Sequence, residues 1–84
     1  MEILGTKITV YSKPNCMQCN FTKKFLEENN IEHSVVDVTK DSVALDMIKL
    51  HGYQGVPVVA VDGFDNSWQG FRPDRLEELK EVAE

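Results

Sequence analysis

The chain has 84 residues, of which 42% are hydrophobic and 27% charged, which is ordinary for one small soluble domain covering 1–84. Nine Lys and Arg against 14 Asp and Glu give a net charge of −5, whereas nucleic-acid-binding domains are usually basic, so no nucleic acid partner is expected. The longest apolar run, Val56–Val61, is far shorter than the roughly 20 residues of a membrane span. The N-terminus lacks the pattern of a signal peptide, so we expect a cytoplasmic protein that contacts no membrane.

Strands and helices are predicted to alternate along the chain, from clusters of β-branched residues and from helical spacing of apolar residues. In chain order we expect a strand over 8–11, a helix over 16–29, a strand over 33–38, a helix over 42–50, strands over 56–61 and 65–69, and a helix over 73–83. This order, β-α-β-α-β-β-α, predicts an α/β fold in which a four-stranded mixed sheet is flanked by three helices.

Two apolar patterns inside these elements predict which residues are buried. Met17, Phe21 and Phe25 recur every four residues, Thr22 and Leu26 flank them, and together they predict the apolar face of the first helix. Val35 and Val36 are adjacent in the second strand, which is typical of a strand that is buried on both faces.

Both cysteines lie in the segment Cys16-Met17-Gln18-Cys19, where the first predicted strand leads into the first predicted helix. Residues three apart in the first helical turn are close enough to form and break a disulfide without moving the fold. The free N–H groups of a helix N-terminus stabilise a thiolate, so Cys16 is the expected nucleophile and Cys19 the buried resolving cysteine. The segment therefore predicts thiol–disulfide exchange.

Other interpretations of this segment remain open. A zinc site would need His33 and His51 as additional ligands, but the spacing C-x2-C-x13-H-x17-H is unlike that of a zinc finger. The two cysteines could instead be inert core residues.

Three lysines surround the cysteine segment in an otherwise acidic protein. Lys13 precedes Cys16 by three residues, and Lys23 and Lys24 follow on the same predicted helix. They either support the thiolate and attract an acidic partner segment, or they form an ordinary solvated surface.

The chain resembles the glutaredoxin-like pattern of the thioredoxin superfamily. In this pattern a strand is followed by Cys16-x-x-Cys19 at the start of a helix, and Gly55-Val56-Pro57 precedes another strand. The resemblance implies the thioredoxin fold. In that superfamily this proline is cis and faces the cysteine pair, so Pro57 is expected to be cis. The residue before it, here Val56, would offer its backbone to an extended peptide or to glutathione.

Two motifs narrow the resemblance to the NrdH-type redoxins. The cysteine segment resembles their C-[VM]-Q-C, and residues 68–74, WQGFRPD, resemble their W-S-G-F-R-P-D with Gln69 in place of Ser. These redoxins accept electrons from thioredoxin reductase and pass them to the large subunit of class Ib ribonucleotide reductase. The resemblance implies those two partners for this chain. We expect a monomer with no cofactor besides the Cys16–Cys19 disulfide.

The resemblance also assigns expected roles to the remaining site residues. Those expected to bind the substrate or a partner are Lys13, Met17, Gln18, Val56, Pro57, Trp68, Gly70 and Phe71. For Trp68 and Phe71 a place in the core is equally compatible with the sequence. Arg72 and Asp74 are expected to connect the turn at 69–71 to the last helix.

Two further functions remain as alternatives. A glutathione-dependent glutaredoxin usually has Gly-Gly-x-Asp after its fourth strand and Pro-Tyr between its cysteines, whereas this chain has residues 68–71, WQGF, and Met-Gln at those places. This difference favours thioredoxin reductase over glutathione as the electron donor. The other alternative is a zinc-binding or regulatory C-x-x-C module.

Overall fold

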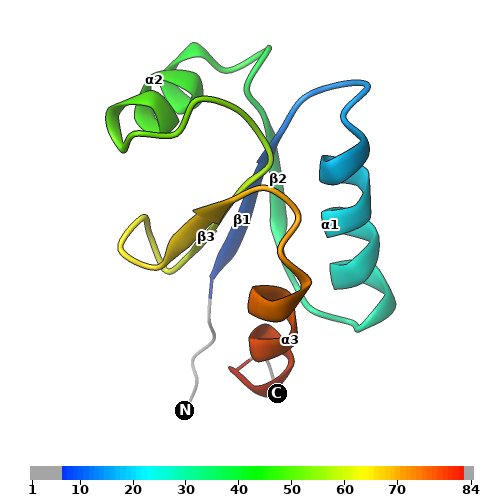
Figure 1. Cartoon of the computed structure of the whole chain (residues 1–84). Coiled ribbons are helices and arrows are strands. Elements are labelled where there is room, and N and C mark those ends of the chain that lie inside the picture. Colours follow the sequence, from blue (N-terminus) through cyan, green and yellow to red (C-terminus); the bar gives the residue numbers. More distant parts are fainter. Residues whose placement is uncertain (1–6, 83–84) are drawn as a thin grey trace.

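A four-stranded sheet with helices on both faces makes up residues 7–82, the part of the chain that the computed structural model describes (Figure 1). The strands are β1 (Ile8–Ser12), β2 (Ser34–Asp37), β3 (Val58–Val61) and β4 (Ser67–Gln69). The helices are α1 (Met17–Glu28), α2 (Ser42–Leu50) and α3 (Pro73–Val82). The predicted order of elements is therefore confirmed. Ala83, the predicted last residue of the third helix, lies outside the described residues.

The sheet has the strand order β2-β1-β3-β4 and is mixed, as predicted. β1 pairs in parallel with β2 and antiparallel with β3, and β3 pairs antiparallel with β4. The cysteine segment and the Val56–Pro57 segment thus lie at the ends of the two central strands, β1 and β3. Cys16 follows the end of β1, and Pro57 directly precedes β3.

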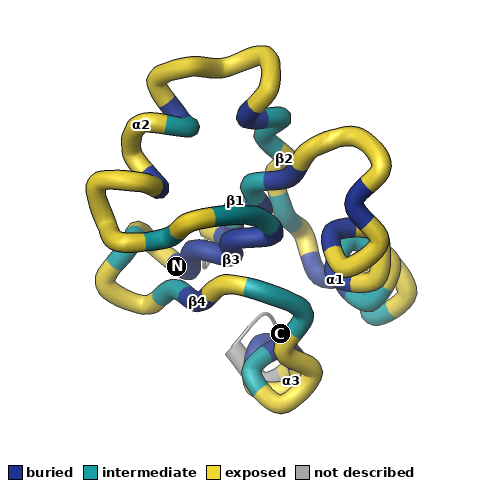
Figure 2. The backbone as a smooth tube through the Cα atoms, turned by 45° about the horizontal axis from the view of Figure 1, so that its top comes forward, coloured by how far each residue is buried: buried dark blue, intermediate teal, exposed yellow. Residues whose placement is uncertain are grey.

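The helices divide between the two faces of the sheet (Figures 1 and 2). α1 and α3 cover one face, where Leu26 and Leu76 pack with Val10 and Val59 of the central strands. α2 covers the other face, and its members of the second core cluster are Ala44 and Ile48. α2 begins where the sequence predicts a cap, because Oδ1 of Asp41 accepts a hydrogen bond from the Ala44 N–H at 3.0 Å.

The predicted apolar face of α1 is confirmed only in part. Thr22 and Leu26 are buried and Phe25 packs against the core, but Met17 is 71% exposed and Phe21 48%. The helix turns the face that carries Cys19 toward the sheet, and Met17 consequently points to the opposite side. An apolar repeat shows that a face is apolar, but it does not show that the sheet covers that face.

The prediction that β2 is buried on both faces is also wrong. β2 is an edge strand with β1 as its one neighbour among the described strands, and Val35 is 47% exposed. β3, a central strand, is buried along its whole length. Within the described residues there is no helix both long and apolar enough to span a membrane.

Candidate functional site

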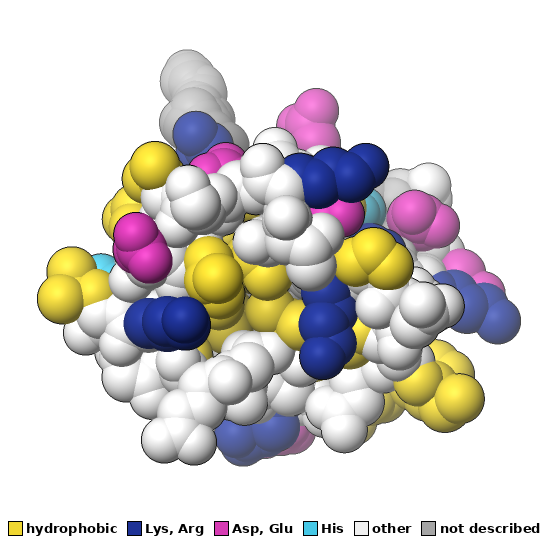
Figure 3. Space-filling view, turned by 90° about the horizontal axis from the view of Figure 1, so that it is seen from above, with side chains coloured by type: hydrophobic (Ala, Val, Ile, Leu, Met, Phe, Trp, Pro, Cys, Tyr) yellow, Lys and Arg dark blue, Asp and Glu magenta, His cyan; other side chains and the backbone are white. Residues whose placement is uncertain are grey.

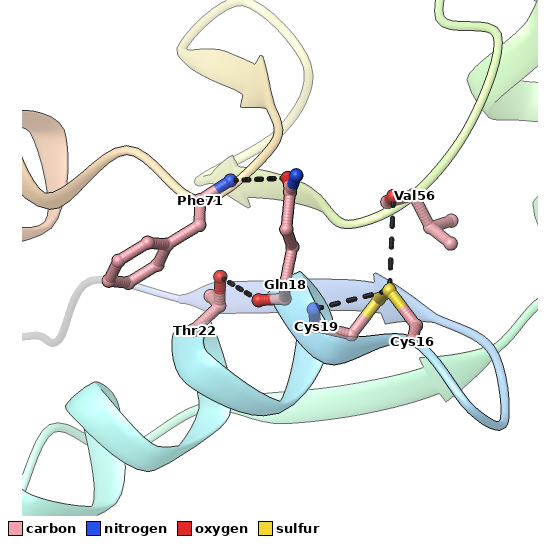
Figure 4. The surroundings of a disulfide bond; sticks show 6 residues. All are labelled: Cys16, Gln18, Cys19, Thr22, Val56 and Phe71. Atoms are coloured by element: carbon pink, nitrogen blue, oxygen red, sulfur yellow. Dashed lines mark hydrogen bonds between the residues drawn. A yellow bond between two sulfur atoms is a disulfide. The ribbon is translucent and has the colours of Figure 1, made fainter.

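The two cysteines form a disulfide at the N-terminus of α1, with their Cα atoms 5.2 Å apart (Figure 4). Cys16 is the N-cap residue of α1, and its Sγ accepts a hydrogen bond from the backbone N–H of Cys19 at 3.2 Å. Cys16 is 8% exposed and Cys19 is fully buried. An N–H directed at the sulfur of Cys16 favours the thiolate after reduction, and of the two sulfurs that of Cys16 is the more accessible to a partner.

The segment before β3 lies against the disulfide. The peptide bond between Val56 and Pro57 is cis, the form that the resemblance implied. The carbonyl oxygen of Val56 lies 4.0 Å from Sγ of Cys16, although 40 residues separate them in the chain. Pro57 is buried beside the strand, and its carbonyl oxygen accepts a hydrogen bond from the Gly70 N–H at 2.7 Å. The Val56 backbone therefore borders the sulfur of Cys16.

Gln18 connects the cysteine segment to the turn after β4. Its Oε1 accepts a hydrogen bond from the backbone N–H of Phe71 at 3.2 Å (Figure 4). Gly70 has a φ of +92°, and a Cβ at this position would lie 3.5 Å from the same Oε1. That distance is an ordinary contact, so it is the positive φ that accounts for glycine here. The turn at 70–71 thus contacts both halves of the site, through Pro57 and through Gln18.

Three apolar side chains lie on the surface next to the disulfide. Met17 and Phe21 are exposed on α1, and the Phe21 ring is 5.7 Å from the half-buried Phe71 ring, centroid to centroid. We call Met17, Phe21 and Phe71 the Met17 surface. Phe21 was not among the residues predicted to bind a partner, because its spacing from Met17 was interpreted as core.

Trp68 is a core residue. It is 4% exposed, belongs to the main core cluster and pairs with Val59 in the sheet, so its side chain is not available to a partner. The Arg75 guanidinium lies over its ring at 4.7 Å from the centroid. The sequence left open whether Trp68 belongs to the core or to a docking surface, and the structure places it in the core.

Arg72 and Asp74 form a two-point ion pair at the start of α3. Nε and Nη2 of Arg72 donate to the two carboxylate oxygens of Asp74 at 3.2 and 3.1 Å. These hydrogen bonds hold the pKa of the Asp74 carboxyl below its usual value. Both side chains are exposed, and the pair lies at the first residues of α3.

The lysines near the cysteines have different surroundings. Lys13 is exposed on the loop between β1 and α1 and lines a cavity together with Val56. Lys24 forms a salt bridge with Glu28, one turn further along α1, at 3.9 Å. The structure therefore brings Lys13, but not Lys24, to the site.

The two histidines proposed as zinc ligands are engaged elsewhere. Nδ1 of His33 lies 2.8 Å from the carbonyl oxygen of Ile31, and the His51 ring stacks on Phe64 with the centroids 4.3 Å apart. Within residues 7–82, no three His, Cys, Asp or Glu side chains are grouped so that they could hold a metal ion.

The chain is similar to glutaredoxin-like proteins over most of its length. A glutaredoxin family model matches residues 8–64, which include both cysteines and the Val56–Pro57 segment. The glutaredoxin-like protein NrdH of Salmonella typhimurium is 39% identical over 72 residues, which are 86% of each chain. NrdH of Lactococcus lactis subsp. cremoris is 36% identical over 72 residues, 86% of this chain and 97% of its own. The solved structure of the glutaredoxin-like protein NrdH-redoxin from Escherichia coli has a TM-score of 0.80 and 33% identity, covering 87% of this chain and 93% of that one.

Proposed function

The chain belongs to the glutaredoxin family as an NrdH-type glutaredoxin-like redoxin, a thiol–disulfide oxidoreductase, and from this premise we propose that it carries electrons from thioredoxin reductase to a class Ib ribonucleotide reductase. The proposal includes the roles of the two cysteines and of the residues that bind the partners. We also propose that the chain is a cytoplasmic monomer and that its disulfide is its redox group, with no bound cofactor.

Donation of electrons begins with the reduced pair. The Cys16 thiolate attacks one sulfur of a partner disulfide, forms a mixed disulfide and releases the other partner sulfur as a thiolate that takes up a proton. The Cys19 thiolate then attacks Sγ of Cys16 and releases the second partner sulfur. Two electrons have moved to the partner, and the Cys16–Cys19 disulfide has formed. The Cys19 N–H that points at Sγ of Cys16 supports this order, because it stabilises the negative charge on the attacking sulfur.

The observation that carries the choice of electron donor is the Met17 surface. Exposed apolar side chains grouped at a reactive site are typical of contact with another protein, whereas glutathione is a charged tripeptide that is held mainly by polar groups. The turn at 70–71, where glutaredoxins usually carry Gly-Gly-x-Asp, has Phe71 and no carboxylate. Both features support a flavoprotein reductase as the donor.

The test compares two electron donors for the oxidised protein. One reaction contains thioredoxin reductase and NADPH, the other glutathione, glutathione reductase and NADPH, and both follow NADPH consumption. We expect rapid oxidation of NADPH, one per Cys16–Cys19 disulfide, with thioredoxin reductase and slow oxidation with glutathione. The Cys16→Ser variant provides the background rate. Rapid reduction of the disulfide by glutathione and none by thioredoxin reductase would identify a glutathione-dependent glutaredoxin instead.

The second half of the proposal is tested with the acceptor. Class Ib ribonucleotide reductase is supplied with this protein as the sole source of dithiol, regenerated by NADPH and thioredoxin reductase, and deoxyribonucleotide formation is measured. We expect product to increase with the concentration of the wild-type chain and to remain at background with Cys16→Ser.

A further inference from the structure

Met17 exposes a thioether at the reactive end of the molecule. It is 71% exposed, whereas Met47, the other methionine among residues 7–82, is 41% exposed. α1 begins at the upper end of the molecule in Figure 1, and Figure 3 views that end from above. Apolar side chains reach the surface there, with lysine or arginine side chains beside them. The sulfur of Met17 is therefore accessible to oxidants dissolved in water.

The disulfide state leaves Met17 as the most accessible sulfur next to the reacting pair. Cys16 is 8% exposed, Cys19 is fully buried, and their sulfurs are bonded to each other. Peroxide converts a cysteine thiolate to a sulfenic acid, which condenses with a neighbouring thiol to a disulfide and releases water. Once the Cys16–Cys19 disulfide has formed, the next sulfur that peroxide reaches at this end is the thioether of Met17.

Oxidation of this thioether transfers one oxygen atom. The sulfur attacks one oxygen of hydrogen peroxide, the O–O bond breaks, and methionine sulfoxide and water are formed, so that two electrons pass from the sulfur to the peroxide. Methionine sulfoxide reductases reverse the change: two thiols become a disulfide, and the sulfoxide oxygen leaves as water. The modification is therefore reversible, unlike oxidation of a cysteine to its sulfonic acid.

A sulfoxide changes the character of the Met17 surface. Phe21 lies one turn from Met17 on α1, and the Phe71 ring is 5.7 Å from the Phe21 ring. The sulfoxide oxygen is a hydrogen-bond acceptor, but the two phenyl rings offer it no donor, and the backbone N–H of Phe71 is already bonded to Gln18. Covering this oxygen with an apolar partner surface would remove its hydrogen bonds to water. Oxidation of Met17 therefore weakens docking on this surface.

We propose that Met17 is a reversible oxidation site that regulates the redoxin: hydrogen peroxide converts Met17 to its sulfoxide, and the modified chain docks less well on its electron donor. The proposal rests on the proposed reduction by thioredoxin reductase and adds to it a regulation by oxidants. Under excess peroxide the cysteine pair is oxidised first and Met17 second. The disulfide is then reduced more slowly until the sulfoxide has been repaired.

The first experiment locates the oxidation. The full chain, with the Cys16–Cys19 disulfide formed, is treated with hydrogen peroxide for increasing times, and catalase then removes the peroxide. Peptide mass mapping measures the addition of one oxygen atom at each methionine. We expect Met17 to be oxidised about twofold or more faster than Met47, because it is more accessible. Oxidation of Met47 at an equal or higher rate would overturn the proposal.

The second experiment connects the oxidation with docking. For each variant, the kcat/KM with thioredoxin reductase after peroxide treatment is divided by the value before treatment. The wild-type ratio should fall by about fivefold or more, because an unpaired polar group is costly at an interface. Met17→Leu has no thioether at this place but keeps the other two methionines, and its kcat/KM should not change on treatment. Met47→Leu is the matched control and should lose as much as the wild type.

The outcomes separate this proposal from the proposed function. Equal losses in the wild type and in Met17→Leu, or an unchanged wild type whose Met17 is oxidised, would overturn the regulation and leave the proposed electron transfer intact. Treatment with the sulfoxide reductases for both epimers should restore the wild-type value, and failure to restore it would also overturn the proposal. No reduction of the untreated wild type by thioredoxin reductase would instead contradict the proposed donor, and the regulation with it.

Discussion

Gln18 and Phe71 are joined by a hydrogen bond of 3.2 Å across 53 residues of chain, from the Phe71 N–H to Oε1 of the Gln18 side chain. Gln18 is one of the two residues between the cysteines, and Phe71 belongs to the turn that follows β4. Gln18 thus helps to fix the position of the half-buried Phe71 ring of the Met17 surface relative to the disulfide.

Replacement of Gln18 tests this connection. Gln18→Ala removes the acceptor, and we expect the free energy of unfolding to fall by about 0.5–1.5 kcal/mol, the usual net value of one hydrogen bond. Because the turn at 70–71 is then less fixed, the kcat/KM with thioredoxin reductase should fall as well. Gln18→Glu keeps an acceptor oxygen at the same place and should retain more of both quantities. Asn20→Ala, an exposed change on the same helix, is the control, and equal effects of the Ala variants at 18 and 20 would contradict this account.

The roles of the two cysteines are expected to be unequal. Cys16 is partly accessible and Cys19 is fully buried, so the first bond to a partner should form at Cys16. Cys19→Ser should therefore accumulate a stable mixed disulfide with an oxidised partner, whereas Cys16→Ser should not. Non-reducing electrophoresis and mass spectrometry of the trapped species measure this. Comparable trapping by both variants would reverse or remove the assignment.

Met17 and Trp68 should respond to truncation in opposite ways. Trp68→Ala opens a hole in the core, and we expect a loss of about 3–5 kcal/mol of folding free energy. Met17→Ala changes an exposed side chain, so stability should stay within about 0.5 kcal/mol, while the kcat/KM with thioredoxin reductase decreases. Urea unfolding and NADPH consumption on the same preparations separate the two effects. A Met17→Ala variant with unchanged kinetics would argue against the Met17 surface as the docking site.

Gly70 is expected to tolerate a side chain poorly. Its φ of +92° is unfavourable for residues with a Cβ, and Gly70→Ala should cost about 1–2 kcal/mol. Gly55→Ala is the matched control on the facing loop, where the added Cβ would lie 3.5 Å from the movable amide of Gln69. Urea unfolding measures the two losses: if the dependence of the unfolding free energy on urea concentration is unchanged, the shift in midpoint gives the change in stability. A smaller loss for Gly70→Ala than for Gly55→Ala would contradict the prediction.

The order of elements and much of the site could be predicted from the sequence because local signals and the overall fold agree. Asp41 caps α2, Pro73 begins α3, and Cys16 stands at the start of α1, as the sequence indicates. These features depend on the residues within one helical turn, and the resemblance to a known family supplied the distant contact between Cys16 and Val56. The predicted thioredoxin fold is confirmed by the comparison with NrdH-redoxin.

The errors concern residues whose burial depends on distant parts of the chain. Met17 and Phe21 repeat together with Phe25, which packs against the core, but both are exposed because the helix is rotated toward Cys19, Thr22 and Leu26. Val35 resembles a central-strand residue, yet strand order places it at an edge. Neither helix rotation nor strand order is encoded in a short window of sequence, and the same holds for the cation–π contact between Arg75 and Trp68.

The pairing of β1 with β3 has a consequence for synthesis of the protein on the ribosome. The register joins Ile8 to Val61, so one side of β1 has no partner until the chain has been made past residue 61 and has left the exit tunnel. The Cys16–Cys19 segment emerges long before the Val56 carbonyl that lies beside it in the finished molecule. A nascent chain therefore exposes two free cysteines without their native surroundings, and the redox site forms only after residue 61 has left the tunnel.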